Sequence, residues 1–188
     1  ITVLAVGRQR NLNFEIRGNK MSTVLKRKIV MKKARIAVIG LGYVGLPLAV
    51  NFAKAGFKVF GLDMDADRVA QVNKRKSYIL DIPTREVAKV VDSGRLEAST
   101  EFGVLNTIDV IIICVPTPLK SKYTPDITYI LSAVRTIGKY LKRDSLIIIE
   151  STTYPGTTEE LICPELEKGG WKAGKDFYLS FSPERIDP

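Results

Sequence analysis

Histidine is absent from the 188-residue sequence, and cysteine occurs only twice, at Cys114 and Cys163. The lack of histidine excludes a site on this chain in which an imidazole acts as the acid or base. The two cysteines form no CxxC pair, so the sequence predicts neither a disulfide framework nor a zinc site. No apolar run approaches the ~20 residues that a membrane-spanning helix needs. We therefore expect a cytoplasmic protein with no bound metal and no membrane contact.

The positive charge is concentrated near the N-terminus. The formal net charge is +9. Residues 1–34 contain nine basic and one acidic residue, a net charge of +8, whereas residues 35–188 contain 20 basic and 19 acidic residues, a net charge of +1. A basic tail can bind nucleic acid or anionic lipid. The alternative is a solvated extension, and we expect residues 1–32 to be such a leader, disordered or partly non-native, with no nucleic-acid partner.

Residues 33–188 are predicted to form one domain. Met21 and Met31 are both candidate start sites, so residues 1–20 are left out of the predicted fold. The leader shows no evident amphipathic period, and we expect its removal to leave the domain stable.

Short apolar runs alternate with helical patterns throughout this domain. Strands are predicted at residues 35–39, 58–63, 96–100, 109–115, 145–150 and 176–182, and helices at residues 43–55, 65–74, 85–92, 127–141 and from 157 onward. The β-α-β alternation predicts a Rossmann-type, doubly wound α/β fold with a mostly parallel six-stranded sheet.

Two helix starts carry capping signals. Asp126 is the predicted N-cap of the helix over residues 127–141. Thr157 and Glu160 have the T-x-x-E spacing of a capping box. Pro164 is expected to kink the helix after Thr157 or to limit its first segment.

The most informative stretch is GLGYVG, which comprises Gly40, Leu41, Gly42, Tyr43, Val44 and Gly45. It follows a predicted strand and opens a predicted helix. The next strand ends in Asp63, 23 positions after Gly40, close to the spacing of about 20 in dinucleotide-binding folds. A glycine-rich turn without a ligand is the alternative. The complete context favours a dinucleotide whose pyrophosphate lies at the helix N-terminus.

Asp63 also predicts which dinucleotide is bound. A carboxylate at this place can accept hydrogen bonds from both ribose hydroxyls and repels a 2′-phosphate. Met64 follows it, so no adjacent arginine neutralises such a phosphate. NAD is therefore predicted over NADP. Arg68, one helical turn later, is either a contact of the adenine or a solvated helix cation.

Prolines and hydroxyl side chains follow the ends of three other predicted strands. They occur in the stretches CVPTPLK (114–120), ESTTYPGTTEE (150–160) and SFSPERIDP (180–188). Prolines can simply end a strand, and hydroxyls can simply cap a helix. Three such loops at one sheet edge are better explained by a binding site, because ligands of open α/β sheets bind beyond the carboxyl ends of the strands.

Together, the motifs GLGYVGLPLA, CVPTPL, ESTTYPGTT and SPERIDP resemble the N-terminal, NAD-binding domain of the UDP-glucose/GDP-mannose dehydrogenase family over about residues 33–188. The variants STTYPGTTEE and SPERIDP are more similar to the branch that oxidises UDP-N-acetylglucosamine at C6 than to the UDP-glucose branch. The resemblance implies an NAD-linked double oxidation of a primary alcohol to a carboxylate, through a cysteine-bound thiohemiacetal and thioester.

The resemblance also implies roles for individual residues. The loop from Gly40 to Gly45, Asp63 and Arg68 would hold NAD. Val115 and Thr117 would flank its nicotinamide half, and Ser151 and Thr152 would lie beside the reactive centre. Thr152 would position a water molecule, and Glu184 would be the acid/base group, acting through that water.

The sequence departs from the family at its C-terminus. Family members continue into a linking helix and a second domain that supplies the nucleophilic cysteine, an oxyanion-stabilising lysine and most uridine contacts, whereas this sequence ends at Pro188. Cys114 and Cys163 are predicted to be small core residues. We expect this chain to be a fragment that is inactive alone. Its expected partners are the C-terminal domain of the same enzyme and a UDP-sugar, and we expect the full-length protein to be a homo-oligomer. The alternative is a stand-alone dinucleotide-binding or sensing module.

Overall fold

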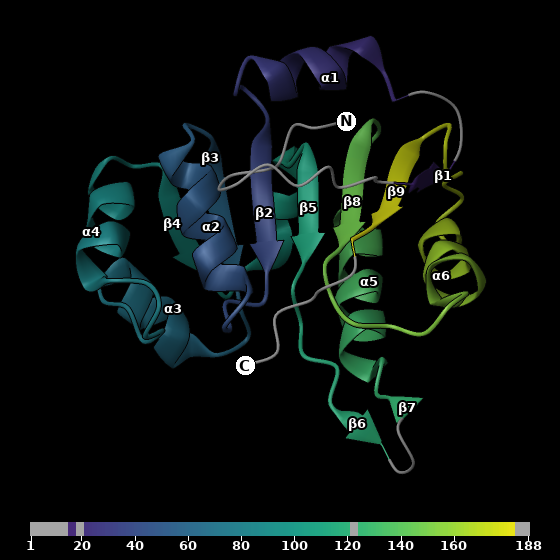
Figure 1. Ribbon diagram of the computed structural model, residues 1–188. Helices are drawn as coiled ribbons and strands as arrows, with labels where there is room; N and C mark the ends of the chain where they lie inside the picture. The colour runs from purple at the N-terminus through teal and green to yellow at the C-terminus, as the bar shows by residue number, and fades with distance from the viewer. Residues whose placement is uncertain (1–14, 18–20, 121–123, 183–188) are drawn as a thin grey trace.

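A seven-stranded sheet forms the centre of the computed structural model, which describes residues 15–17, 21–120 and 124–182 (Figure 1). Along the sheet the strands are β4 (Leu96–Ser99), β3 (Lys58–Leu62), β2 (Arg35–Ile39), β5 (Val110–Ile113), β8 (Ser145–Ile149), β9 (Phe177–Phe181) and β1 (Glu15–Arg17). The six strands from β4 to β9 run parallel, and β1 pairs antiparallel with β9. The predicted doubly wound fold is confirmed, and the unpredicted β1 adds an edge strand.

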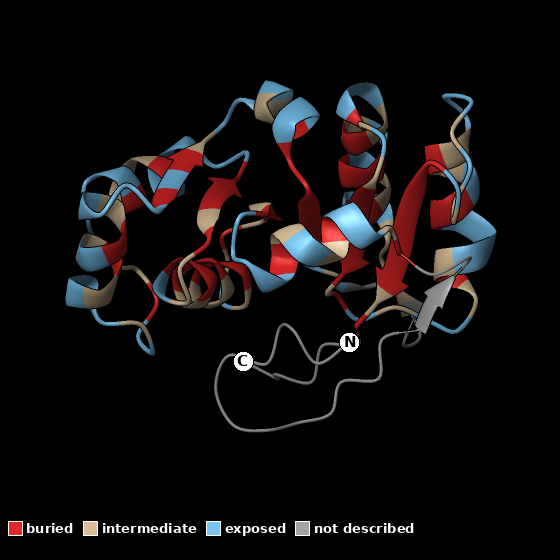
Figure 2. Cartoon of the chain, turned by 90° about the horizontal axis from the view of Figure 1, so that it is seen from above, coloured by how far each residue is buried: buried red, intermediate tan, exposed pale blue. Residues whose placement is uncertain are grey.

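Helices cover both faces of the sheet. Helices α2 (Gly45–Lys54), α3 (Ala66–Asn73) and α4 (Thr84–Asp92) share one hydrophobic cluster with the sheet, and α5 (Thr128–Tyr140), α6 (Cys163–Glu167) and the 3-10 helix over Phe102–Thr107 share the other. Figure 2 shows the buried strands between the exposed outer faces of these helices. A small hairpin, β6 (Leu119–Lys120) with β7 (Thr124–Pro125), projects beyond the sheet.

The central strands are apolar on both faces, as strands of covered parallel sheets are. In β2, Ile36 and Val38 belong to one cluster, and Ala37 and Ile39 belong to the other. Every residue of β5 and β8 is buried. The two-sided burial explains why these strands were recognisable as continuous apolar runs.

Both predicted capping arrangements need correction. Ile127 is the N-cap of α5, and Asp126 instead accepts a hydrogen bond from the Thr128 amide at 2.9 Å. The capping box after Gly156 does not form, because the Thr157 hydroxyl donates to the Tyr154 carbonyl at 2.8 Å. A π-helical turn over Thr158–Ile162 begins this segment.

Pro164 lies at the start of α6, directly after the π-helical turn. Proline has no N–H to donate into the preceding turn, which is why it is tolerated in the first turn of a helix. The prediction that Pro164 limits the first helical segment is confirmed.

The leader departs most from expectation. Residues 23–30 form α1 (Thr23–Val30), and Met21, Leu25 and Ile29 are buried in the main core. Ser22 caps this helix by accepting from the Leu25 amide at 3.0 Å, and its hydroxyl donates to an Asp144 carboxylate oxygen at 2.7 Å. The prediction of an unpacked leader is therefore wrong for residues 21–31, because an i, i+4, i+8 apolar stripe lies within the basic run.

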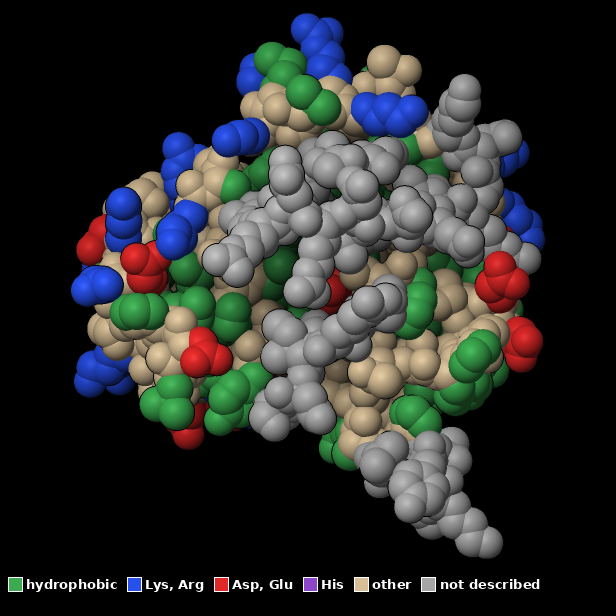
Figure 3. Space-filling view, viewed as in Figure 1, with side chains coloured by type: hydrophobic (Ala, Val, Ile, Leu, Met, Phe, Trp, Pro, Cys, Tyr) green, Lys and Arg blue, Asp and Glu red, His purple; other side chains and the backbone are tan. Residues whose placement is uncertain are grey.

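The basic residues of this segment lie on the outside of the packed helix. Figure 3 shows lysine and arginine side chains gathered around α1 at the top of the molecule. Helix α1 carries no acidic residue in its first turn, and Arg27 and Lys28 lie in its last turn, where cations oppose the negative end of the helix dipole. Residues 1–14 and 18–20 of the leader lie outside the described residues.

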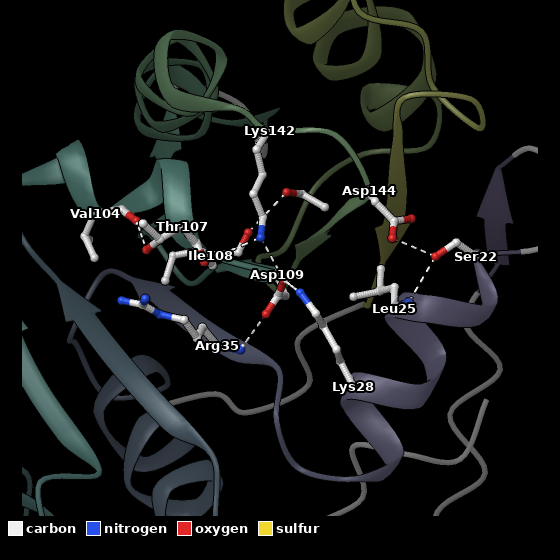
Figure 4. Close-up of polar contacts among 11 residues, drawn as sticks. Ser22, Leu25, Lys28, Arg35, Val104, Thr107, Ile108, Asp109, Lys142 and Asp144 are labelled. Carbon is white, nitrogen blue, oxygen red and sulfur yellow. Dashed lines mark hydrogen bonds and ion pairs between the residues drawn. The ribbon is translucent and has the colours of Figure 1, made fainter.

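Asp109 ties α1 to the sheet (Figure 4). Its carboxylate accepts hydrogen bonds from Lys28 Nζ at 2.8 Å, Lys142 Nζ at 2.7 Å and the Arg35 amide at 2.9 Å. Burial raises the pKa of Asp109, but the hydrogen bonds from Lys142, Lys28 and Arg35 outweigh that effect, and the pKa lies below its ordinary value. One carboxylate thus joins α1, β2 and the segment after α5 at the amino ends of the strands.

Candidate cofactor site

The candidate site lies at the carboxyl ends of the parallel strands, opposite α1 (Figure 1). The connections after β2 and β3 run toward β4, whereas the chain from β5 onward runs toward β9. The strand order therefore reverses between β2 and β5. In open α/β sheets this switch point is where the ligand crevice forms, and the loop after β2 lies at it.

The three glycines of this loop serve different purposes. Gly40 has φ +91°, and a Cβ there would lie 2.5 Å from the Cys114 carbonyl oxygen. A Cβ at Gly45 would lie 1.7 Å from the Gly40 carbonyl oxygen. The first and third glycines are thus required by the fold itself.

Gly42 is the exception, because a Cβ there would meet no atom of the described residues within 4 Å. Folding gives no reason for a glycine at this position. A ligand that approaches the backbone closely does give one, as the pyrophosphate of a dinucleotide would. The loop therefore fits the cofactor that its sequence predicts.

Helix α2 begins at this loop and presents an uncapped N-terminus. Val44 is the N-cap and makes no side-chain capping hydrogen bond, and no acidic residue lies in the first turn. In the first turn the Leu46 amide donates to the Gly42 carbonyl oxygen at 3.1 Å and Pro47 has no N–H, but the dipole still makes this end of the helix positive. Such an end attracts an anion such as a phosphate.

Asp63 follows β3 and contacts the glycine loop. One carboxylate oxygen accepts from the Leu41 amide at 2.7 Å, and the other accepts from the Asp65 amide at 2.9 Å. The side chain is buried. Each oxygen keeps acceptor capacity, so the carboxylate can hold the loop and accept from a ribose hydroxyl at the same time.

Arg68 lies next to these carboxylates. Its Nη1 is 3.5 Å from Asp63 Oδ2, and its Nε is 3.4 Å from Asp65 Oδ2. The guanidinium is about half exposed, so these ion pairs contribute little to stability. A contact between Arg68 and an adenine stays a prediction.

The loops after β5 and β8 follow neighbouring parallel strands at the same edge of the sheet. The Ser151 hydroxyl is within hydrogen-bonding distance of two carbonyl oxygens, Val115 at 2.9 Å and Ile113 at 3.3 Å. Ser151 is buried, whereas Thr152 is exposed and Thr117 is half-buried. Ser151 thus joins the two loops, and Thr152 lies at the solvent side of this edge.

The sequence-predicted residues are only partly brought together by the described structure. The loop from Gly40 to Gly45 contacts Asp63 through Leu41, and Ser151 contacts Val115. Glu184 lies outside the described residues, as does most of the SPERIDP motif.

Both cysteines are buried, and their prediction as core residues is confirmed. Cys114 belongs to the cluster on the α2 face, and Cys163 belongs to the cluster on the α5 face. Cys114 Cβ would lie 3.3 Å from a Cβ at Gly45. The Cys114 side chain therefore backs the glycine loop.

Tyr78 contacts the glycine loop and was missed by sequence reasoning. It comes from the segment between α3 and α4, and its hydroxyl donates to the Leu41 carbonyl oxygen at 2.6 Å. A single tyrosine in an irregular segment gives no periodic signal, and its partner is 37 positions away. Only the folded chain reveals the contact.

Within the described residues, no three or more Cys, Asp or Glu side chains group in a way that could hold a metal ion. No helix in the described part of the chain is long and apolar enough to cross a membrane.

Residues 34–188 match the family model of the UDP-glucose/GDP-mannose dehydrogenase family, NAD binding domain. The chain belongs to this family. It contains the family's NAD-binding domain, and the predicted cofactor is confirmed as NAD at the level of the family.

Curated relatives agree with this assignment. The chain is 40% identical over 159 residues to a UDP-N-acetyl-D-glucosamine 6-dehydrogenase of Pseudomonas aeruginosa, which covers 84% of this chain and 37% of the relative. It is 39% identical over 155 residues to a UDP-N-acetyl-D-mannosamine dehydrogenase of Pyrococcus horikoshii, and this match covers 82% of this chain and 37% of the relative. The chain thus spans little more than a third of the length of these relatives.

Solved structures share the fold. The UDP-D-ManNAc dehydrogenase of Pyrococcus horikoshii superposes with a TM-score of 0.77 at 40% identity, over 82% of this chain and 37% of that one. A ternary complex of GDP-mannose dehydrogenase from Pseudomonas aeruginosa gives a TM-score of 0.77 at 32% identity, over 81% and 36%.

Proposed function

We propose that the whole protein oxidises the C6 hydroxyl of a UDP-sugar to a uronic acid with NAD as the oxidant. This chain supplies the NAD domain and half of the active site. UDP-N-acetylglucosamine is the favoured substrate and UDP-glucose the next. The observation that carries the cofactor half is the open space beside Gly42 at the uncapped N-terminus of α2. The choice of UDP-N-acetylglucosamine as the favoured substrate is supported by the STTYPGTTEE motif and by relatives named for UDP-N-acetyl sugars.

NAD supplies the acceptor for a hydride when it is bound. The backbone at Gly42 and the positive end of the α2 dipole bind its pyrophosphate, because no acidic residue in the first turn of α2 repels an anion. Asp63 accepts from the ribose hydroxyls of the adenosine half while it holds the Leu41 amide. The carboxylate charge that serves this contact also disfavours the 2′-phosphate of NADP.

The residues after β5 and β8 serve the reacting end. Val115 and Thr117 flank the nicotinamide half, and Ser151 keeps the two loops in register through its contact with the Val115 carbonyl. Thr152, which is exposed, holds a water molecule beside the sugar. Glu184 moves the proton, as a general base for the alcohol and through the water held by Thr152.

The remaining functions belong to the part of the relatives that this chain does not match. That part, nearly two thirds of their length, supplies the nucleophilic cysteine, an oxyanion-stabilising lysine and the uridine site. Cys114 and Cys163 are unsuited to be the nucleophile because both are packed in the core, and a nucleophilic cysteine needs an accessible, electropositive surrounding. Assembly of the whole protein into a homo-oligomer is part of this proposal.

The absorbance of NADH at 340 nm tests the proposal. The 188-residue chain with NAD and either UDP-sugar should produce no NADH. The same chain extended by the C-terminal part of the family should produce it. Glu184→Gln in the extended protein should lower kcat by about 10²–10⁴-fold, whereas the exposed control Glu101→Gln should leave it unchanged. Steady turnover by the 188-residue chain, or full activity of Glu184→Gln, would contradict the assignment of these roles.

A stand-alone dinucleotide-binding or sensing module is the second candidate. It is favoured by one observation, the burial of both cysteines in a domain whose cofactor loop is already held in place. The same assay separates the two candidates, because a sensor binds NAD and yields no NADH in the extended protein as well.

A further inference from the structure

The peptide groups of Leu41 are held from two sides. The Leu41 amide donates to Asp63 Oδ2 at 2.7 Å, and the Leu41 carbonyl oxygen accepts from the Tyr78 hydroxyl at 2.6 Å. Just before it, the Gly40 amide donates to the Leu62 carbonyl oxygen at 2.8 Å. Three backbone polar groups of Gly40 and Leu41 are thus fixed by hydrogen bonds to residues outside the loop.

The Tyr78 contact sets the direction of the next N–H group. The Leu41 carbonyl and the Gly42 N–H belong to one planar peptide unit. None of the peptide bonds of the described residues is cis, so the two groups point to opposite sides of the chain. A hydroxyl that holds the carbonyl on one side therefore aims the Gly42 N–H to the other side. Gly42 is also the residue whose missing side chain leaves open space.

Tyr78 itself is well fixed. Its ring packs against the main core, and the neighbouring Ile79 is buried. Ser77 closes the local turn, since its Oγ accepts from the Ile79 amide at 3.2 Å and its own amide donates to Thr84 Oγ1 at 3.2 Å. The segment that carries the Tyr78 hydroxyl to Leu41 is therefore held in place by its own hydrogen bonds.

The hydroxyl also stays a donor. Burial and the Asp63 charge raise the pKa of Tyr78 far above that of a free tyrosine, and the nearby Asp65 adds to the rise, while Arg68 opposes it. The phenol is consequently protonated at every pH at which the domain is expected to work. It therefore keeps the proton that it donates to the Leu41 carbonyl oxygen.

We propose that Tyr78 is a positioning residue for the cofactor pyrophosphate: its hydroxyl orients the Leu41–Gly42 peptide so that the Gly42 N–H faces the phosphates. The inference rests on the proposed NAD site at this loop. Tyr78 acts through the backbone. Its removal should therefore weaken every ligand that carries the pyrophosphate and spare a ligand that has only the adenosine part.

Calorimetric titration of Tyr78→Phe with NAD, ADP and adenosine provides the test. The ring is retained, so the fold and the packing are kept while the donor is lost. The dissociation constants for NAD and ADP should rise about 3- to 10-fold, the value of one hydrogen bond. The constant for adenosine should stay within about twofold of the wild-type value. The matched control Tyr129→Phe, at an exposed tyrosine of α5, should leave all three unchanged.

The adenosine measurement separates positioning from folding. If Tyr78→Phe loses affinity for adenosine as strongly as for NAD, the residue has only a structural role and the inference is overturned. Wild-type affinity of Tyr78→Phe for NAD overturns it as well, and leaves the proposed NAD site intact. A wild-type chain that binds neither NAD nor ADP would overturn the proposed site and this inference together.

Discussion

Replacing Asp109 with asparagine should destabilise the domain at the edge of the sheet where the amino ends of the parallel strands lie. The substitution keeps the shape of the side chain but removes the charge on which Lys28, Lys142 and the Arg35 amide converge. The new amide group also places a donor against partners that are all donors. Helix α1 loses its ionic link to the residue before β5 and remains attached through its buried apolar side chains and the Ser22–Asp144 hydrogen bond.

The magnitude follows from the exposure of each partner. A hydrogen bond to a charged group contributes about 1.5–3 kcal/mol. The Lys28 and Lys142 side chains are 44% and 28% exposed, so water competes for both and each contributes near or below the lower end of that range. We expect a loss of about 2–4 kcal/mol, which corresponds to a fall in Tm of about 5–12 °C for a chain of this size.

The effect should depend on pH with a definite sign. The pKa of Asp109 is lowered in the folded protein, so its contribution is complete above the unfolded value of about 3.9. The contribution disappears as the pH falls through the folded-state pKa. The gap in Tm between the wild type and Asp109→Asn should therefore be widest at neutral pH and narrow progressively below about pH 4.

Thermal melts followed by circular dichroism at neutral pH and at about pH 3 provide the measurement. Asp92→Asn is the matched control, because Asp92 pairs with Arg75 at the surface and both side chains are 55% exposed; its Tm should change by less than about 2 °C. Equal Tm values for the wild type and Asp109→Asn at neutral pH would refute the reasoning. So would a gap that stays constant in acid.

Four further substitutions have expected outcomes. Gly42→Val should abolish NAD binding in calorimetry while the Tm stays near the native value, and normal NAD binding by this variant would place the phosphates elsewhere. Gly45→Ala should instead disrupt the fold, since its Cβ would lie 1.7 Å from a carbonyl oxygen. Asp63→Ala should reduce the preference for NAD over NADP by about 10-fold or more, and an unchanged ratio would exclude Asp63 as its source. In urea titrations, Leu25→Ala should lower the free energy of unfolding by about 2–5 kcal/mol, whereas Val24→Ala, at an exposed position, should change it hardly at all. Equal urea midpoints for the two variants would mean that α1 does not pack on the core.

The parallel sheet and the glycine loop could be predicted because their signals are local. The continuous apolar runs of β5 and β8 are buried on both faces. Gly40 and Gly45 stand where the strand–turn–helix unit itself leaves no room for a side chain. Asp63 could be predicted too, since it directly follows the next strand along the chain.

The remaining features depend on contacts between distant parts of the chain. Asp109 meets Lys28 and Lys142 across 81 and 33 positions, and Tyr78 meets Leu41 across 37. No spacing rule relates such pairs before the fold is known. Helix α1 was a different case. Its apolar stripe is present in the sequence, but the basic residues around it obscure the periodicity, and the prediction that the leader lies outside the core is wrong for residues 21–31.

Calorimetric titration of the 188-residue chain with NAD and with NADP measures directly whether the loop at Gly42 and the carboxylate of Asp63 form a cofactor site. We predict saturable binding of one NAD per chain. We also predict affinity for NADP that is lower by about 10- to 100-fold, the equivalent of a charge-assisted hydrogen bond. A titration that detects no NAD binding, or equal affinity for the two dinucleotides, would contradict the site described above.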